Sequence, residues 1–299
     1  MAERREVVVI GAGPAGIAAT IFLQRGGFNP LLLEMGVPGG LVRQANLVEN
    51  YPGFPGGVTG LQLAELFCKH LRGVGGAITI ARVSKVRRTG RDFVTSSSVG
   101  EFLSKAVIIA TGTKAKRVVL RGATGRLRRR VHYDLYDLTA ASKADEQVVV
   151  YGGGDAAFDQ GINLRRSGHR VTVLCRSEPS CLPLLRERAV ENGAVVVEGQ
   201  SIVRVIEAEE GLELELSGGA KIDTGRLLVA CGREPRLELL DPSLRARILP
   251  YNPPCTEVRG LYLAGDVVAG GRRQVGIAVG SGISAAMSTE RFLRGEAPQ

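Results

Sequence analysis

VVVIGAGPAGIAATIFLQRGGFNPLLLE, residues 7–34, is the stretch that decides the fold. Its first four residues, Val7–Ile10, form an apolar run typical of a strand buried on both faces of a parallel sheet. Gly11, Gly13 and Gly16 then give G-x-G-x-x-G, and an apolar helix follows. In this pattern the glycines permit a tight turn, a close approach to a pyrophosphate, and close packing of the helix on the strand.

The same stretch supplies the acid that such a site needs. A second apolar run, residues 30–33, ends in Glu34, about twenty residues after the glycines, where a carboxylate can hold ribose hydroxyls. The N–H groups and dipole at the helix N-terminus would face the anion. We therefore predict a dinucleotide site; the alternative is a tight βα turn without a ligand.

The pattern returns in QVVVYGGGDAAFDQGINLRRSGHRVTVLCR, residues 147–176. Gly152, Gly154 and Ala157 give G-x-G-x-x-A after a strand, and the second strand ends at Cys175-Arg176 with no acid. An arginine there is the usual accommodation of a 2′-phosphate. The spacing predicts a second dinucleotide site.

The composition is that of a soluble globular protein of 299 residues, 44% hydrophobic and 23% charged. The net charge of +9 is compatible with nucleic acid, but aromatic residues are only 5% with no tryptophan, which supplies few stacking platforms. No apolar run reaches the roughly 18 residues of a membrane span. The N-terminus enters the first strand at once and leaves no room for a signal peptide, so we expect a cytoplasmic protein. From the few aromatic residues and the short apolar runs, we expect it to bind neither nucleic acid nor membrane.

These patterns predict an α/β protein with two Rossmann-like dinucleotide-binding domains, the second inserted into the first. The first domain would comprise residues 1–115 and 243–299, and the second residues 116–242. We expect antiparallel strands over residues 78–103, before a buried strand at 106–110. Residues 114–130 carry eight basic side chains and no acid, and mark a domain boundary.

The five cysteines include no C-x-x-C pair and no even set for disulfides. Cys68 and Cys231 lie in apolar surroundings, typical of inert core residues. A redox or metal role for Cys175 and Cys181 is the alternative to a purely structural one. No metal site is predicted.

Taken together, the motifs resemble the thioredoxin reductase family of flavoproteins with two dinucleotide sites, over nearly the whole chain. The resemblance rests on short motifs spread along the sequence: GAGPAG at 11–16, PGG at 38–40, ENYPGFPGG at 49–57, ATGT at 110–113, GGGDAA at 152–157, AGDV at 264–267 and RQ at 273–274.

The resemblance implies FAD in the first site and NADPH or NADH in the second. The residues implied for FAD are Gly11, Gly13, Pro14, Ala15, Gly16, Glu34, Gly39, Gly40, Asn50, Val83, Thr111, Gly112, Gly265, Asp266, Arg273 and Gln274. Those implied for the nicotinamide nucleotide are Gly152, Gly153, Gly154, Asp155, Ala156, Ala157 and Arg176. Within the FAD set, Asp266 would lie by the ribityl and pyrophosphate groups, and Asn50, Arg273 and Gln274 by the isoalloxazine.

The chain departs from the family where the redox-active C-x-x-C belongs, because Asp134 and Asp137 occupy the two cysteine positions. A carboxylate cannot exchange with a disulfide, since that chemistry needs a thiolate. The catalytic residues are therefore unknown. The two acids either cap a helix start or relay protons beside the flavin.

The nicotinamide site is reduced as well, since only Arg176 remains of the family's phosphate-reading bases and Cys181 replaces a later arginine. We expect an FAD-dependent oxidoreductase that passes electrons between NAD(P)H and an external acceptor, such as a small molecule or an acidic ferredoxin or flavodoxin, and that does not reduce thioredoxin. Ferredoxin–NADP reductases of this type also lack the cysteine pair. The alternative is a non-catalytic flavin-binding or redox-sensing protein with a vestigial nicotinamide site. A homodimer is implied by the same resemblance.

Overall fold

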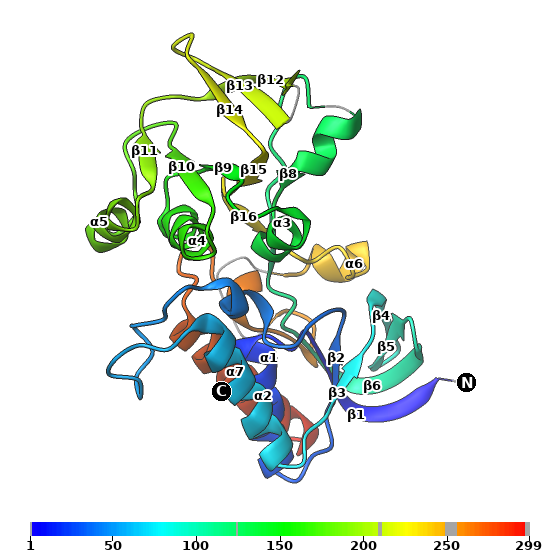
Figure 1. The fold of residues 1–299 in the computed structure, drawn as a ribbon. Helices are drawn as coiled ribbons and strands as arrows, with labels where there is room; N and C mark the ends of the chain where they lie inside the picture. Colours follow the sequence, from blue (N-terminus) through cyan, green and yellow to red (C-terminus); the bar gives the residue numbers. More distant parts are fainter. Residues whose placement is uncertain (1, 124, 209–210, 249–255, 297–299) are drawn as a thin grey trace. The chain divides into compact units, whose positions relative to one another are not determined.

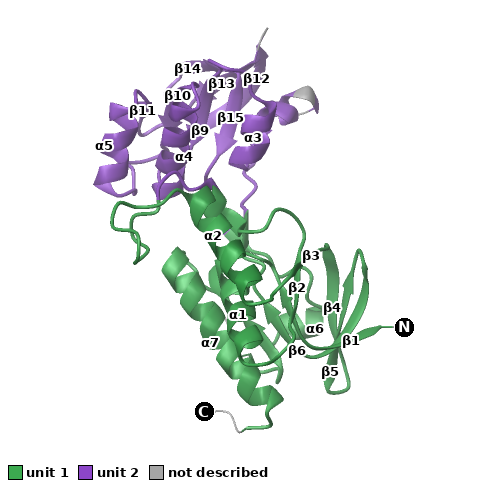
Figure 2. Ribbon diagram, turned by 60° about the horizontal axis from the view of Figure 1, so that its bottom comes forward, with its two compact units in different colours: residues 1–43, 48–114, 234–299 green, residues 44–47, 115–233 purple. Residues whose placement is uncertain are grey.

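The structure, a computed structural model, describes residues 2–123, 125–208, 211–248 and 256–296. The chain forms two compact units (Figure 2). Unit 1 comprises Met1–Arg43, Val48–Lys114 and Glu234–Gln299, and unit 2 comprises Gln44–Leu47 and Ala115–Arg233.

Unit 1 is built on a seven-stranded sheet (Figure 1). Its strands are β1 (Glu3–Ile10), β2 (Leu31–Glu34), β3 (Ile78–Ile80), β4 (Val83–Thr89), β5 (Asp92–Ser97), β6 (Gly100–Ile109) and β17 (Leu261–Leu263). Neighbours in the order β3-β2-β1-β6 are parallel, and β17 is parallel to β6. The long strand β6 continues into an antiparallel meander with β5 and β4.

One part of the predicted antiparallel segment is wrong. Strand β3 lies parallel to β2, with Leu32 opposite Ile78, because the chain crosses over through helix α2 before it enters the sheet. The predicted strand at 106–110 is the second half of β6 rather than a separate element.

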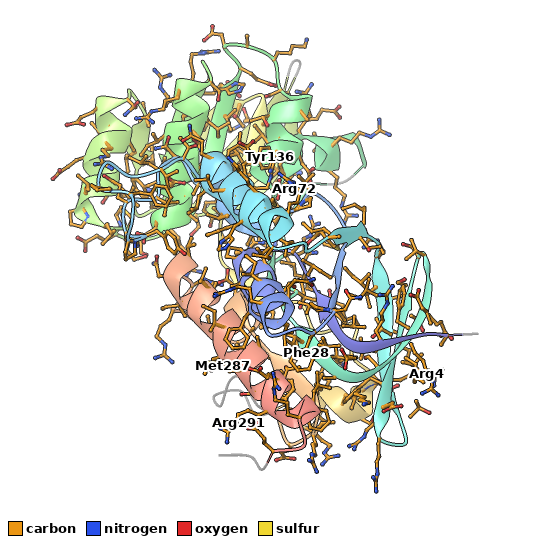
Figure 3. All side chains as sticks on the ribbon, turned by 90° about the horizontal axis from the view of Figure 1, so that it is seen from below. Arg4, Phe28, Arg72, Tyr136, Met287 and Arg291 are labelled. Carbon is orange, nitrogen blue, oxygen red and sulfur yellow. The ribbon has the colours of Figure 1, made fainter. Side chains whose placement is uncertain are left out.

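Three helices of unit 1, α1 (Pro14–Arg25), α2 (Gly60–Gly73) and α7 (Val275–Leu293), cover one face of its parallel strands, and the short α6 (Pro242–Arg245) packs in the core on the other face. Unit 1 also has the single 3₁₀ turns η1 (Gly40–Gln44) and η3 (Gly265–Val267). Helices α1 and α7 lie side by side, and Gly282 lets α7 approach so closely that a Cβ there would be 2.2 Å from the Ala15 carbonyl oxygen. Phe28 packs against the shared core, whereas Met287 on α7 is exposed (Figure 3).

Unit 2 contains a five-stranded parallel sheet in the order β11-β10-β9-β15-β8 and a three-stranded antiparallel sheet in the order β12-β13-β14. Its strands are β8 (Val131–His132), β9 (Gln147–Tyr151), β10 (Arg170–Leu174), β11 (Val195–Val197), β12 (Ile202–Ala208), β13 (Gly211–Leu216), β14 (Lys221–Thr224) and β15 (Arg226–Val229). Its helices are η2 (Gly125–Arg130), α3 (Leu135–Ala141), α4 (Asp155–Arg166) and α5 (Pro183–Glu191). The three α-helices share a core with one face of the parallel sheet, and the antiparallel sheet shares a core with the other.

The chain passes between the units where β7 (Thr113–Ala115) pairs with β16 (Arg233–Pro235). It returns to unit 1 at Glu234 rather than at the predicted residue 243. The proline mark at Asp241-Pro242 is instead the start of α6, capped by Asp241, and Leu244 of this helix is buried in the core of unit 1.

Both units therefore repeat the predicted order of strand, glycine turn, helix and parallel strand, and the α/β class with two Rossmann-like folds is confirmed. Within the described residues, no helix is long and apolar enough to cross a membrane.

Candidate functional site

The glycine turn of unit 1 leaves no room for side chains. Gly11 has φ +104°, and a Cβ there would lie 2.3 Å from the Ala110 carbonyl oxygen. A Cβ on Gly16 would lie 1.8 Å from the Gly11 oxygen. Helix α1 starts after Gly13 with Pro14, no side chain caps it, and its first turn holds no acid. Its N–H groups are thus available to an anion.

The PGG loop lies on this turn. The Gly39 N–H donates to the Ala12 carbonyl oxygen at 2.7 Å. Gly40 has φ +65°, and a Cβ there would be 3.0 Å from the Gly13 Cα. Gly13, Gly39 and Gly40 therefore form one side-chain-free surface beside the start of α1.

Glu34 is oriented by two backbone donors. Its Oε2 accepts from the Ala12 N–H at 2.7 Å and its Oε1 from the Gly36 N–H at 2.9 Å. Each carboxylate oxygen keeps a further lone pair for a hydroxyl group. The Ala81 N–H also donates to the Glu34 carbonyl oxygen at 2.7 Å, and Val83, the half-buried first residue of β4, follows Ala81 by two positions.

Thr111 and Gly112 follow β6 and contact Arg236, which the sequence reasoning missed. The Thr111 hydroxyl donates to the Arg236 carbonyl oxygen at 2.6 Å, and the Arg236 N–H donates to the Gly112 oxygen at 3.0 Å. The Arg236 Nη1 lies 3.4 Å from the sulfur of Met35, which directly follows Glu34. The Nε of Arg236 is buried with no hydrogen-bond partner among the described residues.

The AGDV turn brings the C-terminal part of the chain to the same edge. The Gly265 N–H donates to the Ser281 hydroxyl of α7 at 2.8 Å, and a Cβ on Gly265 would lie 2.8 Å from the Ala15 Cβ. Asp266, half-buried, follows in the first turn of η3.

Asn50 and Gln274 meet at the start of α7. The Asn50 Nδ2 donates to the Gln274 Oε1 at 2.9 Å. Gln274 is the N-cap residue of α7, but no side chain caps the helix and its first turn holds no acid. Arg273 precedes it and is half-buried. This second uncapped helix start therefore has a guanidinium next to it.

The donor set of this edge fits a dinucleotide. Glu34 ends its strand, and Gly11, Thr111 and Asp266 follow theirs, so all four lie at the carboxyl ends of parallel strands, the edge at which ligands bind in such sheets. Uncapped N–H groups suit a pyrophosphate, the carboxylates suit sugar hydroxyls, and the unpartnered Arg236 Nε is a donor that needs an acceptor.

The glycine turn of unit 2 has the same construction. A Cβ on Gly152 would lie 2.5 Å from the Ala230 oxygen, and α4 starts after Gly154 with no side-chain cap. The segment after β10 is hydrogen-bonded to this turn. The Ser180 N–H donates to the Gly153 oxygen at 2.8 Å, and the Leu182 N–H donates to Asp155 Oδ1 at 2.9 Å. Of the next two residues, Ala156 is exposed and Ala157 is buried.

The thiols around this turn are buried or weakly acidic. Cys175 Sγ lies 3.4 Å from the Gly152 oxygen, and burial raises the pKa of this thiol to about 11. Burial also raises the pKa of Cys231, against the opposing charge of Arg176, which is itself exposed. Both thiols are therefore protonated at neutral pH.

Cys181 lines a cavity of about 590 Å³ next to α5. The charged residues that line the same cavity are Glu178, Arg186, Glu187 and Glu191. The guanidinium of Arg186 is paired with Glu198 at 2.5 Å. Among the described residues, no group of three or more histidine, cysteine or acidic side chains could hold a metal ion.

Asp134, which the resemblance would place at the first of two cysteine positions, is the N-cap of α3. Its Oδ1 accepts from the N–H groups of Tyr136 at 2.9 Å and Asp137 at 3.5 Å. Its Oδ2 accepts from the Gln44 Nε2 at 2.5 Å. The capping alternative of the sequence reasoning is thus what the structure shows for Asp134.

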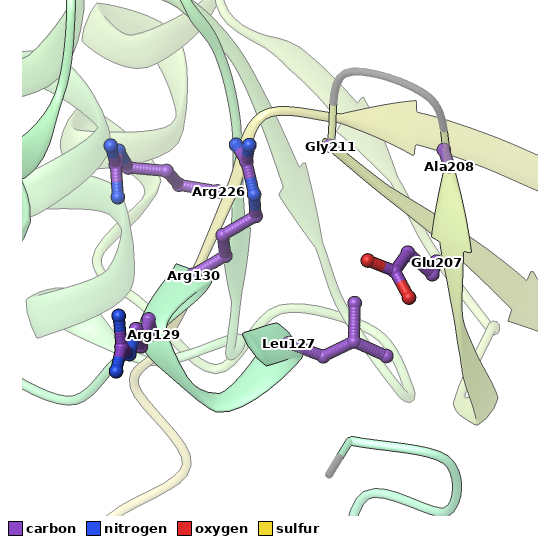
Figure 4. Close-up of a pocket in the computed structure, with 7 residues that line it drawn as sticks. All are labelled: Leu127, Arg129, Arg130, Glu207, Ala208, Gly211 and Arg226. Atoms are coloured by element: carbon purple, nitrogen blue, oxygen red, sulfur yellow. The ribbon is translucent and has the colours of Figure 1, made fainter. Parts of the chain in front are cut away.

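The basic segment before α3 borders a hollow of about 450 Å³, lined by Arg129, Arg130, Arg226 and Glu207 among others (Figure 4). Arg130 lies 3.8 Å and Arg226 3.0 Å from carboxylate oxygens of Glu146. Part of the positive charge is therefore neutralised, whereas Arg129 is exposed.

Comparisons with known proteins agree with this construction. The family model described as pyridine nucleotide-disulphide oxidoreductase matches residues 5–282. The thioredoxin reductase of Chlamydia trachomatis is 30% identical over 96% of this chain and 98% of its own length. That of Bacillus subtilis is 29% identical over 96% and 94%. The crystal structure of Lactococcus lactis thioredoxin reductase in its FR conformation superimposes with a TM-score of 0.87 at 26% identity, over 97% of this chain and 99% of that one.

Proposed function

We propose that this chain, which belongs to the pyridine nucleotide-disulphide oxidoreductase family and is thioredoxin reductase-like, transfers electrons between a nicotinamide nucleotide and an external acceptor. It is an FAD-dependent oxidoreductase that uses a nicotinamide nucleotide. In our proposal, electrons pass between NADPH or NADH and an external acceptor through FAD held by unit 1, without a protein dithiol. The observation that carries this proposal is Asp134, a helix cap where a dithiol would be needed.

The residues of unit 1 supply the binding and the electrostatics. The uncapped first turn of α1 would donate to the pyrophosphate, and Glu34 would accept from ribose hydroxyls. Arg273 and the uncapped start of α7 would stabilise negative charge on the reduced ring. When bound, FAD would supply a two-electron centre between the nucleotide and the acceptor.

The glycine turn of unit 2 would hold the nicotinamide nucleotide through Gly152–Ala157. Arg176 is the one base near the end of β10 that the sequence offers to a 2′-phosphate, and it is exposed. The cavity beside α5 is bordered by more carboxylates than bases. These features support weak discrimination between NADPH and NADH.

The acceptor would be an external carrier or small molecule. Arg128 and Arg129 are exposed basic side chains of η2, and Lys116, Arg117 and Arg121 precede them on the exposed surface of unit 2. A surface of one charge sign raises the rate of encounter with an oppositely charged partner. This supports an acidic ferredoxin or flavodoxin as the acceptor. A homodimer, which the resemblance implies, and a cytoplasmic location are part of the same proposal.

A second candidate, a flavin-binding sensor with a vestigial nicotinamide site, is favoured by one observation. Residues Ser180 and Leu182 already bond to the rim of the glycine turn in unit 2. Nucleotide binding would then be weak while FAD binding stayed tight.

Purification tests the part that both candidates share. The protein should be yellow and should release FAD on denaturation. A colourless preparation that FAD cannot reconstitute would contradict both candidates.

A further inference from the structure

The segment Gln44–Leu47, which we call the strap, is bound by unit 2 although the chain on both sides of it belongs to unit 1. The Gln44 side-chain amide donates to Asp134 Oδ2 at 2.5 Å. The Gln44 carbonyl oxygen accepts from the Asn163 Nδ2 at 2.8 Å. The strap is therefore held at its first residue through both its side chain and its backbone.

One face of α4 binds the rest of the strap. Asp159, Asn163 and Arg166 are spaced i, i+4 and i+7, so they share a face of the helix. Asp159 Oδ2 accepts from the Asn46 N–H at 2.9 Å, and the Leu47 N–H donates to the same carboxyl group. The Arg166 Nη1 donates to the Asn46 Oδ1 at 2.8 Å.

In the sequence, the strap connects two parts of the flavin site proposed above. Gly40 precedes it, on the glycine turn, and Asn50 follows it, bonded to the start of α7. We propose that Asp159 is a positioning residue, which holds Gly40 and Asn50 in place through the strap and holds the strap more tightly when it takes up a proton. The inference rests on the proposed function only for what Gly40 and Asn50 bind.

The direction of the pH effect follows from the environment of the carboxyl group. Burial raises the pKa of Asp159 to about 6, with a smaller raising effect from Asp155, while the two N–H donors and the charge of Arg166 oppose the shift. The strap itself has no ionisable side chain. Release of the strap would expose the carboxyl group and return its pKa to about 3.9. Between these two pKa values, Asp159 therefore keeps its proton while the strap is bound and loses it when the strap is released.

Because of this difference in pKa, the strap should bind more tightly to unit 2 at low pH. Its binding should strengthen as the pH falls through about 6, level off near 4, and change little above 7. From pH 8 to pH 5 the two pKa values give about a tenfold increase in the strap's binding constant.

Hydrogen exchange at the Asn46 and Leu47 amides measures the strap directly, in the full chain with and without FAD. After correction for the intrinsic exchange rate, protection at pH 5 should exceed protection at pH 8 by about tenfold. Asp159→Asn, which cannot ionise, should remove this difference in protection between pH 5 and pH 8, which we call the exchange step. Asp223→Asn, an exposed carboxyl on β14, is the matched control and should leave the step unchanged.

Asn163→Ala keeps the test valid if Asp159→Asn does not fold. Loss of its bond to Gln44 should lower protection about three- to tenfold at both pH values and preserve the step. Equal protection at pH 5 and pH 8 in the wild type, or an unchanged step in Asp159→Asn, would overturn the inference.

A measurement of FAD binding at the two pH values separates this inference from the proposed function. The FAD dissociation constant should fall between pH 8 and pH 5 in the wild type and lose that dependence in Asp159→Asn. A chain with the exchange step but no FAD binding would refute the proposed function, whereas FAD binding with flat exchange would refute the strap.

Discussion

Asn50 and Gln274 are joined by a hydrogen bond of 2.9 Å although 224 positions separate them in the chain. The bond links the loop that carries ENYPGF to the N-cap residue of α7. Neither segment forms this part of the site alone, so its geometry depends on the return of the chain from unit 2. The Asn50–Gln274 pair therefore offers a direct probe of the edge at which we place the isoalloxazine.

Asn50→Ala should weaken FAD binding by roughly two- to tenfold, because a hydrogen bond contributes about 0.5–1.5 kcal/mol and this pair is exposed. Flavin fluorescence titration gives the dissociation constant. Gln274→Ala should have a similar effect, and the double variant should lose less than the product of the two, since both remove one bond. Fully multiplicative losses would show that the two side chains act independently.

Gly16→Ala should lower the free energy of unfolding by about 2–4 kcal/mol and abolish FAD binding, because the new Cβ would meet the Gly11 oxygen at 1.8 Å. The melting temperature and flavin retention check this prediction. Gly73→Ala, at the end of α2 with nothing within 4 Å of its Cβ, is the control and should leave both unchanged or raise stability. Normal FAD retention by Gly16→Ala would contradict the site.

Asp134→Ala should destabilise the chain by about 1–2 kcal/mol, since it removes the cap of α3 and the partner of Gln44. Asp134→Asn keeps a capping side chain and should stay within about 0.5 kcal/mol of the wild type. Chemical denaturation measures both. Equal losses in the two variants would indicate that the charge, and not the cap, is what α3 needs.

Disulfide reduction coupled to NADPH or NADH should stay at the level of free flavin, because Asp134 and Asp137 cannot form the thiolate that disulfide exchange needs. The remaining thiols near the second glycine turn are protonated at neutral pH, with the pKa of Cys175 raised to about 11. An insulin or thioredoxin reduction assay provides the test. Robust reduction that survives Cys175→Ser/Cys181→Ser would mean that another electron path exists.

The sequence predicted the parts that depend on local spacing. Gly11, Gly16 and Gly152 are required by backbone contacts that any Rossmann turn repeats, and Glu34 follows its strand at the usual distance. The positions of these residues could therefore be read without a structure.

What the sequence could not predict depends on contacts between distant segments. Arg236 reaches Thr111 only because β16 pairs with β7, and nothing in its own neighbourhood marks it. The strap lies in a loop whose partners sit on α4, and the only local signal was the polar spacing of Asp159, Asn163 and Arg166 on that helix. The parallel pairing of β3 was likewise fixed by the crossover and not by its three residues.

Arg176→Ala should reduce any preference for NADPH to about one, from an expected preference of about tenfold in the wild type. A hydrogen bond to a charged group contributes about 1.5–3 kcal/mol, and exposure of Arg176 should bring the value to the lower end, where 1.4 kcal/mol is tenfold. The ratio of kcat/KM for the two nucleotides measures it. An undiminished NADPH preference would reject the role of Arg176.

Arg128→Glu/Arg129→Glu should slow reduction of an acidic carrier several-fold at low salt and leave flavin reduction by the nucleotide unchanged. Arg130 is left in place because it pairs with Glu146. The wild-type rate should also fall steeply between about 20 and 300 mM salt, as screening shortens the reach of the charges. Equal rates for the variant and the wild type at low salt would leave the basic segment with a purely structural role.

Anaerobic titration of the FAD-loaded protein with NADH and with NADPH tests the central claim most directly. The account predicts that either nucleotide bleaches the visible absorption of the flavin with a stoichiometry near one, with at most about a tenfold difference in rate between them. A flavin that stays oxidised in the presence of excess NADH and excess NADPH would contradict the account and leave the chain as a flavin-binding protein without nicotinamide chemistry.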